Sequence, residues 1–169
     1  TSCLGRASAL RLPAAGEAVT VTAQITDVDG LSAALLKYRV DPDTNFISVA
    51  LSYRGAGLYS ATLPGQAAGK QVAFYLETYD GSAALAASRF PTAAPARECL
   101  VRFGEPAGLP LLGSYRLWVT EQNVTRWNTR EKQSNHPLDL TFVYGDVRVC
   151  YNAATLYSGS PWHTPGYSG

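Results

Sequence analysis

Short runs of alternating apolar and polar residues, each closed by a turn signal, dominate the chain as far as residue 104. Apolar residues occupy every second position from Val19 to Ile25, which is the period of a strand with one buried face. Runs of this kind occupy residues 18–26, 31–40, 46–53, 58–63, 70–79 and 97–103. Turn-forming pairs such as Pro64-Gly65 and Asp80-Gly81 close several of them. About seven short strands in this arrangement predict a mainly β fold, an antiparallel β-sandwich.

Two of these runs give specific expectations. Residues 46–53 are expected to form one strand, followed by a tight turn at residues 54–57 whose glycines permit positive φ. In the run at residues 70–79, alternation places Val72, Phe74 and Leu76 on one face, with Ala73, Tyr75 and Glu77 on the other.

Composition excludes some classes of function. Of the 169 residues 46% are hydrophobic and 16% are charged, which is typical of a folded protein rather than a disordered one. Lys plus Arg number 14 against 13 for Asp plus Glu, so no bulk charge attracts nucleic acid or an anionic membrane. No apolar stretch is long enough to span a bilayer. We therefore expect neither nucleic-acid binding nor a membrane span.

The three cysteines leave two interpretations open. Cys3 and Cys99 lie near the two ends of the predicted sandwich, where a disulfide is compatible with an exported protein. Both could equally be small buried hydrophobic residues. Cys150 lies in an alternating run and is expected to be a core residue.

The chain changes character at residues 105–112, where Pro106, Gly108 and Pro110 indicate a joint between domains. Beyond it we expect a partial α+β segment at residues 113–169. It begins with a strand at residues 114–120, in which Tyr115 and Leu117 lie opposite Trp118. A helix follows at residues 121–130, capped by Thr120, with Val124 and Trp127 facing inward. Alternation at residues 138–144 and 147–151 predicts a hairpin.

Residues 17–104 carry the strings VTVTAQITDVDG, LLKYRV, LYSATLPGQAAGKQVAFYLETYDG and ECLVRFG. In this order they resemble the immunoglobulin-like and fibronectin-type-III-like modules of large exported bacterial proteins. The resemblance implies that residues 1–104 form an immunoglobulin-like antiparallel β-sandwich that serves as a spacer or docking module. It also implies a secreted or cell-surface location, with protein or cell-surface polysaccharide as potential partners.

Residues 113–164 carry SYRLWVTEQNVTRW and LDLTFVYGDVRVCYNAATLYSGSP. They resemble the beginning of the spore-coat-protein-H (CotH) kinase-like family. The resemblance implies an atypical protein kinase that phosphorylates serine, using ATP and Mg, with its lysine and metal-binding aspartates after Gly169. Because the chain starts at Thr1 and ends in a loop-like run, we expect a non-catalytic fragment of a larger exported bacterial protein, with the downstream domain as its partner.

One short loop is a candidate nucleotide site. Ser158, Gly159 and Ser160 follow a predicted strand, and backbone N–H groups with hydroxyls suit phosphate oxygens. The loop lacks the spacing of known phosphate-binding motifs, so a plain turn is the competing interpretation and any nucleotide would bind only in the intact parent. Asp27 and Asp29 begin like a calcium loop without its later ligands, and we predict no metal ligand and no cofactor for this chain alone.

Two other functions remain open. The chain could be a carbohydrate- or surface-binding module that uses exposed aromatic rings. It could also hold part of the nucleotide lobe of an active atypical kinase. An incomplete second segment would leave an open sheet edge and an uncovered apolar face, so we expect it to pack on the sandwich, pair with another chain, or be mobile.

Overall fold

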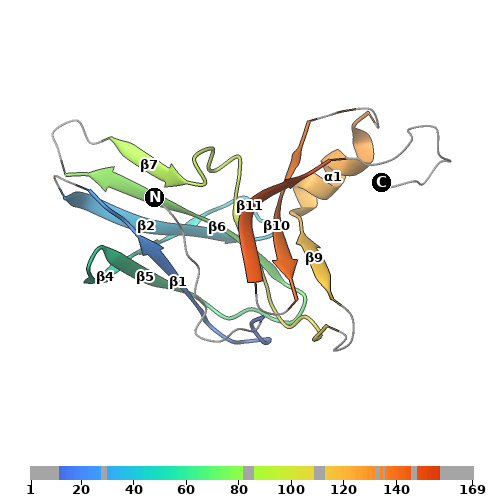
Figure 1. The fold of residues 1–169 in the computed structure, drawn as a ribbon, viewed down its shortest axis with the longest axis horizontal. Coiled ribbons are helices and arrows are strands. Elements are labelled where there is room, and N and C mark those ends of the chain that lie inside the picture. Colours follow the sequence, from blue (N-terminus) through green and yellow to red (C-terminus); the bar gives the residue numbers. More distant parts are fainter. Residues whose placement is uncertain are drawn as a thin grey trace.

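A computed structural model describes residues 12–27, 30–81, 86–108, 113–131, 134, 136–145 and 148–156. Within these ranges the chain forms three antiparallel sheets and one short helix (Figure 1). Sheet A has the order β1 (Val19–Gln24), β5 (Leu58–Leu63) and β4 (Ser52–Gly55). Sheet B has the order β3 (Ile47–Ala50), β2 (Leu31–Val40), β6 (Gln71–Asp80) and β7 (Ala87–Phe90), with β8 (Cys99–Arg102) also paired to β6. Sheet C has the order β11 (Arg148–Thr155), β10 (Leu138–Tyr144) and β9 (Tyr115–Trp118), and helix α1 (Glu121–Thr129) connects β9 to β10.

Sheets A and B form a sandwich, as the alternation predicts. Their inward-facing residues make one core, in which Leu36, Leu63 and Val72 are completely buried. Strands β1, β5 and β4 form one layer of the sandwich, and strands β3, β2, β6, β7 and β8 form the other. The mainly β, antiparallel fold class is therefore confirmed.

The expectation of a single strand at residues 46–53 is wrong. The chain leaves sheet B after β3, and β4 joins sheet A, so two strands replace one. Between them Leu51 is buried, and its N–H donates to the carbonyl of Ala34 at 2.8 Å. Alternation continues through the crossing because both strands face the same core, which hides the change of sheet. The turn is also shorter than expected, since β4 extends to Gly55.

Strand β6 differs from an ordinary half-buried strand, because both of its faces are covered. The eight residues from Gln71 to Thr78 are all buried. One face looks into the sandwich core, while Ala73 on the other face packs with Leu100, Trp118 and Val143. Sheet C supplies the last two of these residues and so covers part of the outer face of sheet B. Its Tyr151 also reaches the sandwich core, where its ring lies 5.6 Å from that of Phe74. Of the three outcomes expected for the second segment, the structure shows packing on the sandwich.

Within the second segment the predicted hairpin and helix cap are confirmed, whereas the predicted burial of Val124 and Cys150 is wrong. Thr120 caps α1 by accepting from the Asn123 N–H. Val124 is 45% exposed rather than buried, because the helix turns Asn123 inward, where its side-chain amide donates to the carbonyl of Asp139. Cys150 is only half-buried, since it lies on the outer face of sheet C. In the described part of the chain, no helix is long and apolar enough to cross a bilayer.

Candidate functional site

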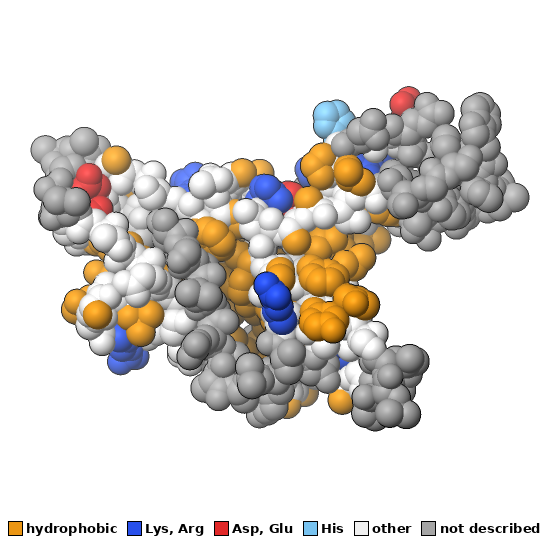
Figure 2. Space-filling model, in the orientation of Figure 1, with side chains coloured by type: hydrophobic (Ala, Val, Ile, Leu, Met, Phe, Trp, Pro, Cys, Tyr) orange, Lys and Arg blue, Asp and Glu red, His pale blue; other side chains and the backbone are white. Residues whose placement is uncertain are grey.

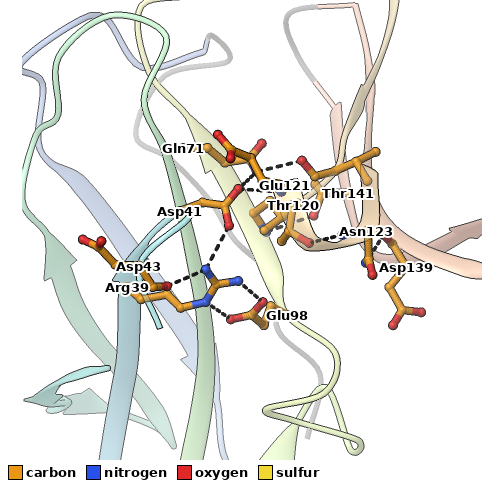
Figure 3. A network of polar contacts seen from close by, with 12 residues as sticks. Arg39, Asp41, Asp43, Gln71, Glu98, Thr120, Glu121, Asn123, Asp139 and Thr141 are labelled. Carbon is orange, nitrogen blue, oxygen red and sulfur yellow. Dashed lines mark hydrogen bonds and ion pairs between the residues drawn. The ribbon is translucent and has the colours of Figure 1, made fainter. Parts of the chain in front are cut away.

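The interface between sheet B and the second segment, here called the junction, holds a network of buried and partly buried polar contacts (Figure 3). Its apolar part is the cluster Ala73, Leu100, Trp118 and Val143, against which Val149 also packs. Within this cluster, Leu100 also donates its backbone N–H to the Thr141 hydroxyl at 2.9 Å. A β10 side chain therefore satisfies a backbone donor of β8 that has no strand partner on that side.

Arg39 is the centre of the polar part. Its guanidinium donates from Nε and Nη2 to both carboxylate oxygens of Glu98, at 2.7 and 2.6 Å. Nη1 donates to Asp41 at 2.9 Å and to the carbonyl of Asp43 at 2.8 Å. Hydrogen bonds to Glu98 raise the pKa of Arg39 above its usual value, against the opposing effect of burial. This two-pronged pairing, which matches the planar shape of both groups, is among the strongest side-chain contacts.

Asp41 connects this cluster to the helix. One carboxylate oxygen accepts from Arg39, and the other accepts from the backbone N–H of Glu121 at 2.9 Å. Gln71 donates to that second oxygen at 3.4 Å and to the carbonyl of Val119 at 3.0 Å. A carboxylate at the first turn of α1 satisfies an unpaired N–H and interacts favourably with the positive end of the helix. The sandwich therefore contributes to capping a helix that lies far along the chain.

A third set of contacts holds β10. Arg97, in the segment before β8, pairs through Nε with Asp139 at 2.8 Å. The side chain of Asn123 donates to the backbone carbonyl of the same residue at 3.1 Å. Asp139 is thus held from the sandwich on one side and from the helix on the other.

The junction includes an open pocket of about 480 Å³, lined by Arg39, Asp41, Phe46, Glu98, Glu121 and Thr125 among others. Two of its carboxylates already accept hydrogen bonds from Arg39, and the described lining residues include no Ser, Cys or His that could act as a nucleophile or base. In the described residues no three His, Cys, Asp or Glu side chains are grouped to hold a metal ion. The charge-assisted hydrogen bonds of Arg39 are suited to fixing one element against another.

A second charged cluster lies farther along the same outer face of sheet B. The completely buried Glu77 pairs with Lys37 at 2.6 Å and with Arg89 at 2.7 Å, and it accepts from the Tyr79 hydroxyl at 3.0 Å. Burial pushes the pKa of Glu77 upward, but the hydrogen bonds from Lys37, Arg89 and Tyr79 outweigh it, so the pKa lies below its usual value.

The site predicted from sequence falls on residues that the structure does not describe. Ser158, Gly159 and Ser160 are outside the described residues, as is Cys3, so the nucleotide loop and the disulfide stay predictions. Cys99 is buried. Sequence analysis missed Arg39, Asp41 and Glu98, because a charge at an outward position of a strand, or next to the end of one, suggests a solvent-facing surface. One signal was available: apolar Ala73 and Tyr75 occupy the outward positions of β6, which indicates a second covering layer.

Comparison with models of known protein families and with curated protein sequences found no match to this chain.

Proposed function

We propose that the sandwich is a docking module that holds the strand–helix–hairpin segment in one fixed orientation, ahead of a CotH-like protein kinase domain in a larger exported bacterial protein. The observation that carries this proposal is the junction, in which Asp41 joins the buried Arg39 to the first turn of α1. A flexible spacer would need no such contact.

The chemistry of the junction supports a fixed orientation. Apolar contacts between Leu100, Trp118 and Val143 stabilise the junction in proportion to the apolar area that they bury. They are not directional, so they fix the orientation of sheet C on sheet B only weakly. The hydrogen bonds from the Glu121 N–H to Asp41 and from the Leu100 N–H to the Thr141 hydroxyl cross the junction with defined distances and directions. A rotation of the second segment on sheet B would break them and leave these polar groups without their partners.

The outer face of sheet C supports the second half of the proposal. Tyr115 is 65% exposed, Leu117 54% and Tyr144 46%. Tyr115 stacks on Phe142 with ring centroids 5.7 Å apart and lies 5.2 Å from the ring of Tyr144. Figure 2 shows hydrophobic side chains gathered over this part of the molecule. A contiguous apolar patch of this kind is typical of a surface that a further domain covers.

The docking half of the proposal is tested by hydrogen exchange on the chain carrying Leu100→Asp, which places a charge in the apolar cluster of the junction. We expect the amides of β9 and β10 to lose protection while those of β1 and β5 keep it. The matched control is Leu117→Asp, the same change on the exposed face of sheet C. Equal protection of β10 in the two variants would contradict docking.

The kinase half is tested by calorimetry with ATP and magnesium, on this chain and on the parent polypeptide extended past Gly169. Binding by the extended form alone would support the proposed kinase domain and assign the present residues to its scaffold. If Ser158, Gly159 and Ser160 contribute to that site, Gly159→Val in the extended form weakens ATP binding. No binding by either form would remove the kinase from the proposal and leave the docking module.

A further inference from the structure

The described residues include a second pocket, at the end of the sandwich that lies away from sheet C (Figure 1). It has a volume of about 360 Å³ and lies between the loop after β1 and the turn between β4 and β5. We call it the tyrosine pocket, because its walls include Tyr53 and Tyr59, together with Gln24, Thr26, Asp27 and Leu31. Its volume falls within the range of small-molecule sites.

The two tyrosines form a supported aromatic platform. They are direct partners across β4 and β5, with ring centroids 5.1 Å apart and planes inclined by 55°. Tyr59 packs against the sandwich core, whereas Tyr53 is 61% exposed. One ring is therefore fixed by the core and supports the other, which is accessible from solvent. A ring that is already ordered loses little conformational entropy when a ligand stacks on it.

The rim of the pocket is tied together before any ligand arrives. The N–H of Ile25 donates to the carbonyl of Gly57 at 2.9 Å, and the Gln24 side-chain amide donates to the carbonyl of Ala56 at 2.7 Å. A Cβ atom at Gly57 would lie 2.6 Å from Nε2 of Gln24, so the two loops approach as closely as glycine allows. On the opposite side the N–H of Gly81 donates to the carbonyl of Gly30 at 2.8 Å.

The groups around the rings define a ligand class. The lining residues Gln24, Thr26 and Asp27 carry amide, hydroxyl and carboxylate oxygens, groups that accept from hydroxyl donors. Among the described lining residues there is no Lys or Arg, so nothing attracts an anion. A ligand with an apolar C–H face for the Tyr53 ring and hydroxyl groups at its edge satisfies both features. We propose that the tyrosine pocket binds a neutral carbohydrate.

This proposal is independent of the junction. Among the residues that the structure describes, no lining residue of the tyrosine pocket belongs to sheet C or α1, and none takes part in the contacts of Arg39. Carbohydrate binding at one end of the sandwich is therefore compatible with docking at the other. Loss of either property in a variant need not affect the other.

The test is affinity electrophoresis of the full chain in native gels that contain hydroxyethylcellulose, xylan, mannan or pullulan, with polygalacturonate as the anionic probe. We expect at least one neutral polysaccharide to retard the chain. Tyr53→Ala should weaken this affinity by about tenfold, and Tyr53→Trp should retain it. Because Tyr53 is exposed, both variants are expected to fold, and their circular dichroism checks this.

The matched control is Tyr144→Ala, which removes another exposed ring, on the far side of the junction. It should migrate in every gel as the unmodified chain does. The proposal is overturned if none of the neutral polysaccharides retards the chain, or if Tyr53→Ala is retarded as strongly as the unmodified chain. Retardation by polygalacturonate alone would refute the neutral class, and loss of binding in Tyr144→Ala would move the site to sheet C.

Discussion

Replacement of Arg39 by methionine is the most informative test of the junction. Methionine has a similar apolar stem, so the change removes the charge while largely keeping the volume. It leaves Asp41 and Glu98 without their cation, and their side chains are only 5% and 10% exposed. Removing one partner of a buried ion pair destabilises a protein by about 3–5 kcal/mol, because the other charge stays buried. This is a large part of the stability of about 5–15 kcal/mol typical of a domain.

The assay is urea unfolding followed by tryptophan fluorescence, since Trp118 is buried in the junction and reports on its loss. Arg102→Met is the control. Arg102 pairs with Glu105 at 3.2 Å, but its side chain is 44% exposed. Exposed pairs contribute about 0–1 kcal/mol, so the control should unfold at nearly the same urea concentration as the unmodified chain.

A double variant separates the two causes of the loss. If uncompensated charge destabilises Arg39→Met, adding Glu98→Gln should restore part of the stability, because the glutamine removes one of the two buried charges. If lost hydrogen bonds alone were responsible, the second substitution would restore nothing. A double variant no more stable than Arg39→Met would therefore refute the argument from buried charge, and equal stability of Arg39→Met and Arg102→Met would refute a stabilising role for the Arg39 ion pairs.

Three further substitutions test separate features. Val143→Ala, at a completely buried position in the junction, should cost about 2–3 kcal/mol in urea unfolding, and Val149→Ala at its half-buried neighbour should cost less. Because the pKa of Glu77 is lowered, its contribution to stability is present above the unfolded pKa of about 4.3 and is lost as pH falls through the folded pKa. Glu77→Gln should accordingly lie closest in stability to the unmodified chain at pH 3, in unfolding curves measured from pH 3 to 7. Ala56 has a positive φ of 49°, which is unfavourable for alanine but not for glycine. Ala56→Gly should therefore raise the free energy of unfolding by about 0.5 kcal/mol, because relief of this strain exceeds the cost of the greater backbone entropy of glycine in the unfolded chain.

The strands could be predicted from sequence because their signal is local. Alternation from Val19 to Ile25 requires only that one face be buried, and the structure buries Val21 and Ala23 as expected. The same signal could not separate β3 from β4, because the chain changes sheet at Leu51 while continuing to face the same core. Hydrogen-bond partners, unlike side-chain periodicity, are decided by residues far away in the chain.

The junction could not be predicted for a related reason. Lys37 and Arg39 alternate with core residues in β2, and a strand of this composition is normally solvated on its charged face. Whether those charges meet solvent or a third layer depends on where sheet C packs. The helix illustrates the same limit: its cap at Thr120 follows from local chemistry, whereas the choice of Asn123 over Val124 as the inward residue depends on the carbonyl of Asp139.

Both clusters of charge on sheet B lie on its outer face, and only one of them lies at the junction. If their purpose were stability alone, apolar residues of similar volume would serve as well or better at Arg39 and Glu98. The ionic arrangement adds a defined orientation of α1 on the sandwich. Asp41 can accept from Arg39 and from the Glu121 N–H at the same time only when the helix lies at one angle to sheet B. A docking module needs this property, since the position of everything attached beyond α1 follows from that single angle. The rigid sandwich then extends the same geometry to its opposite end, where the tyrosine pocket lies, so that a ligand held there would stand in a fixed relation to the second segment.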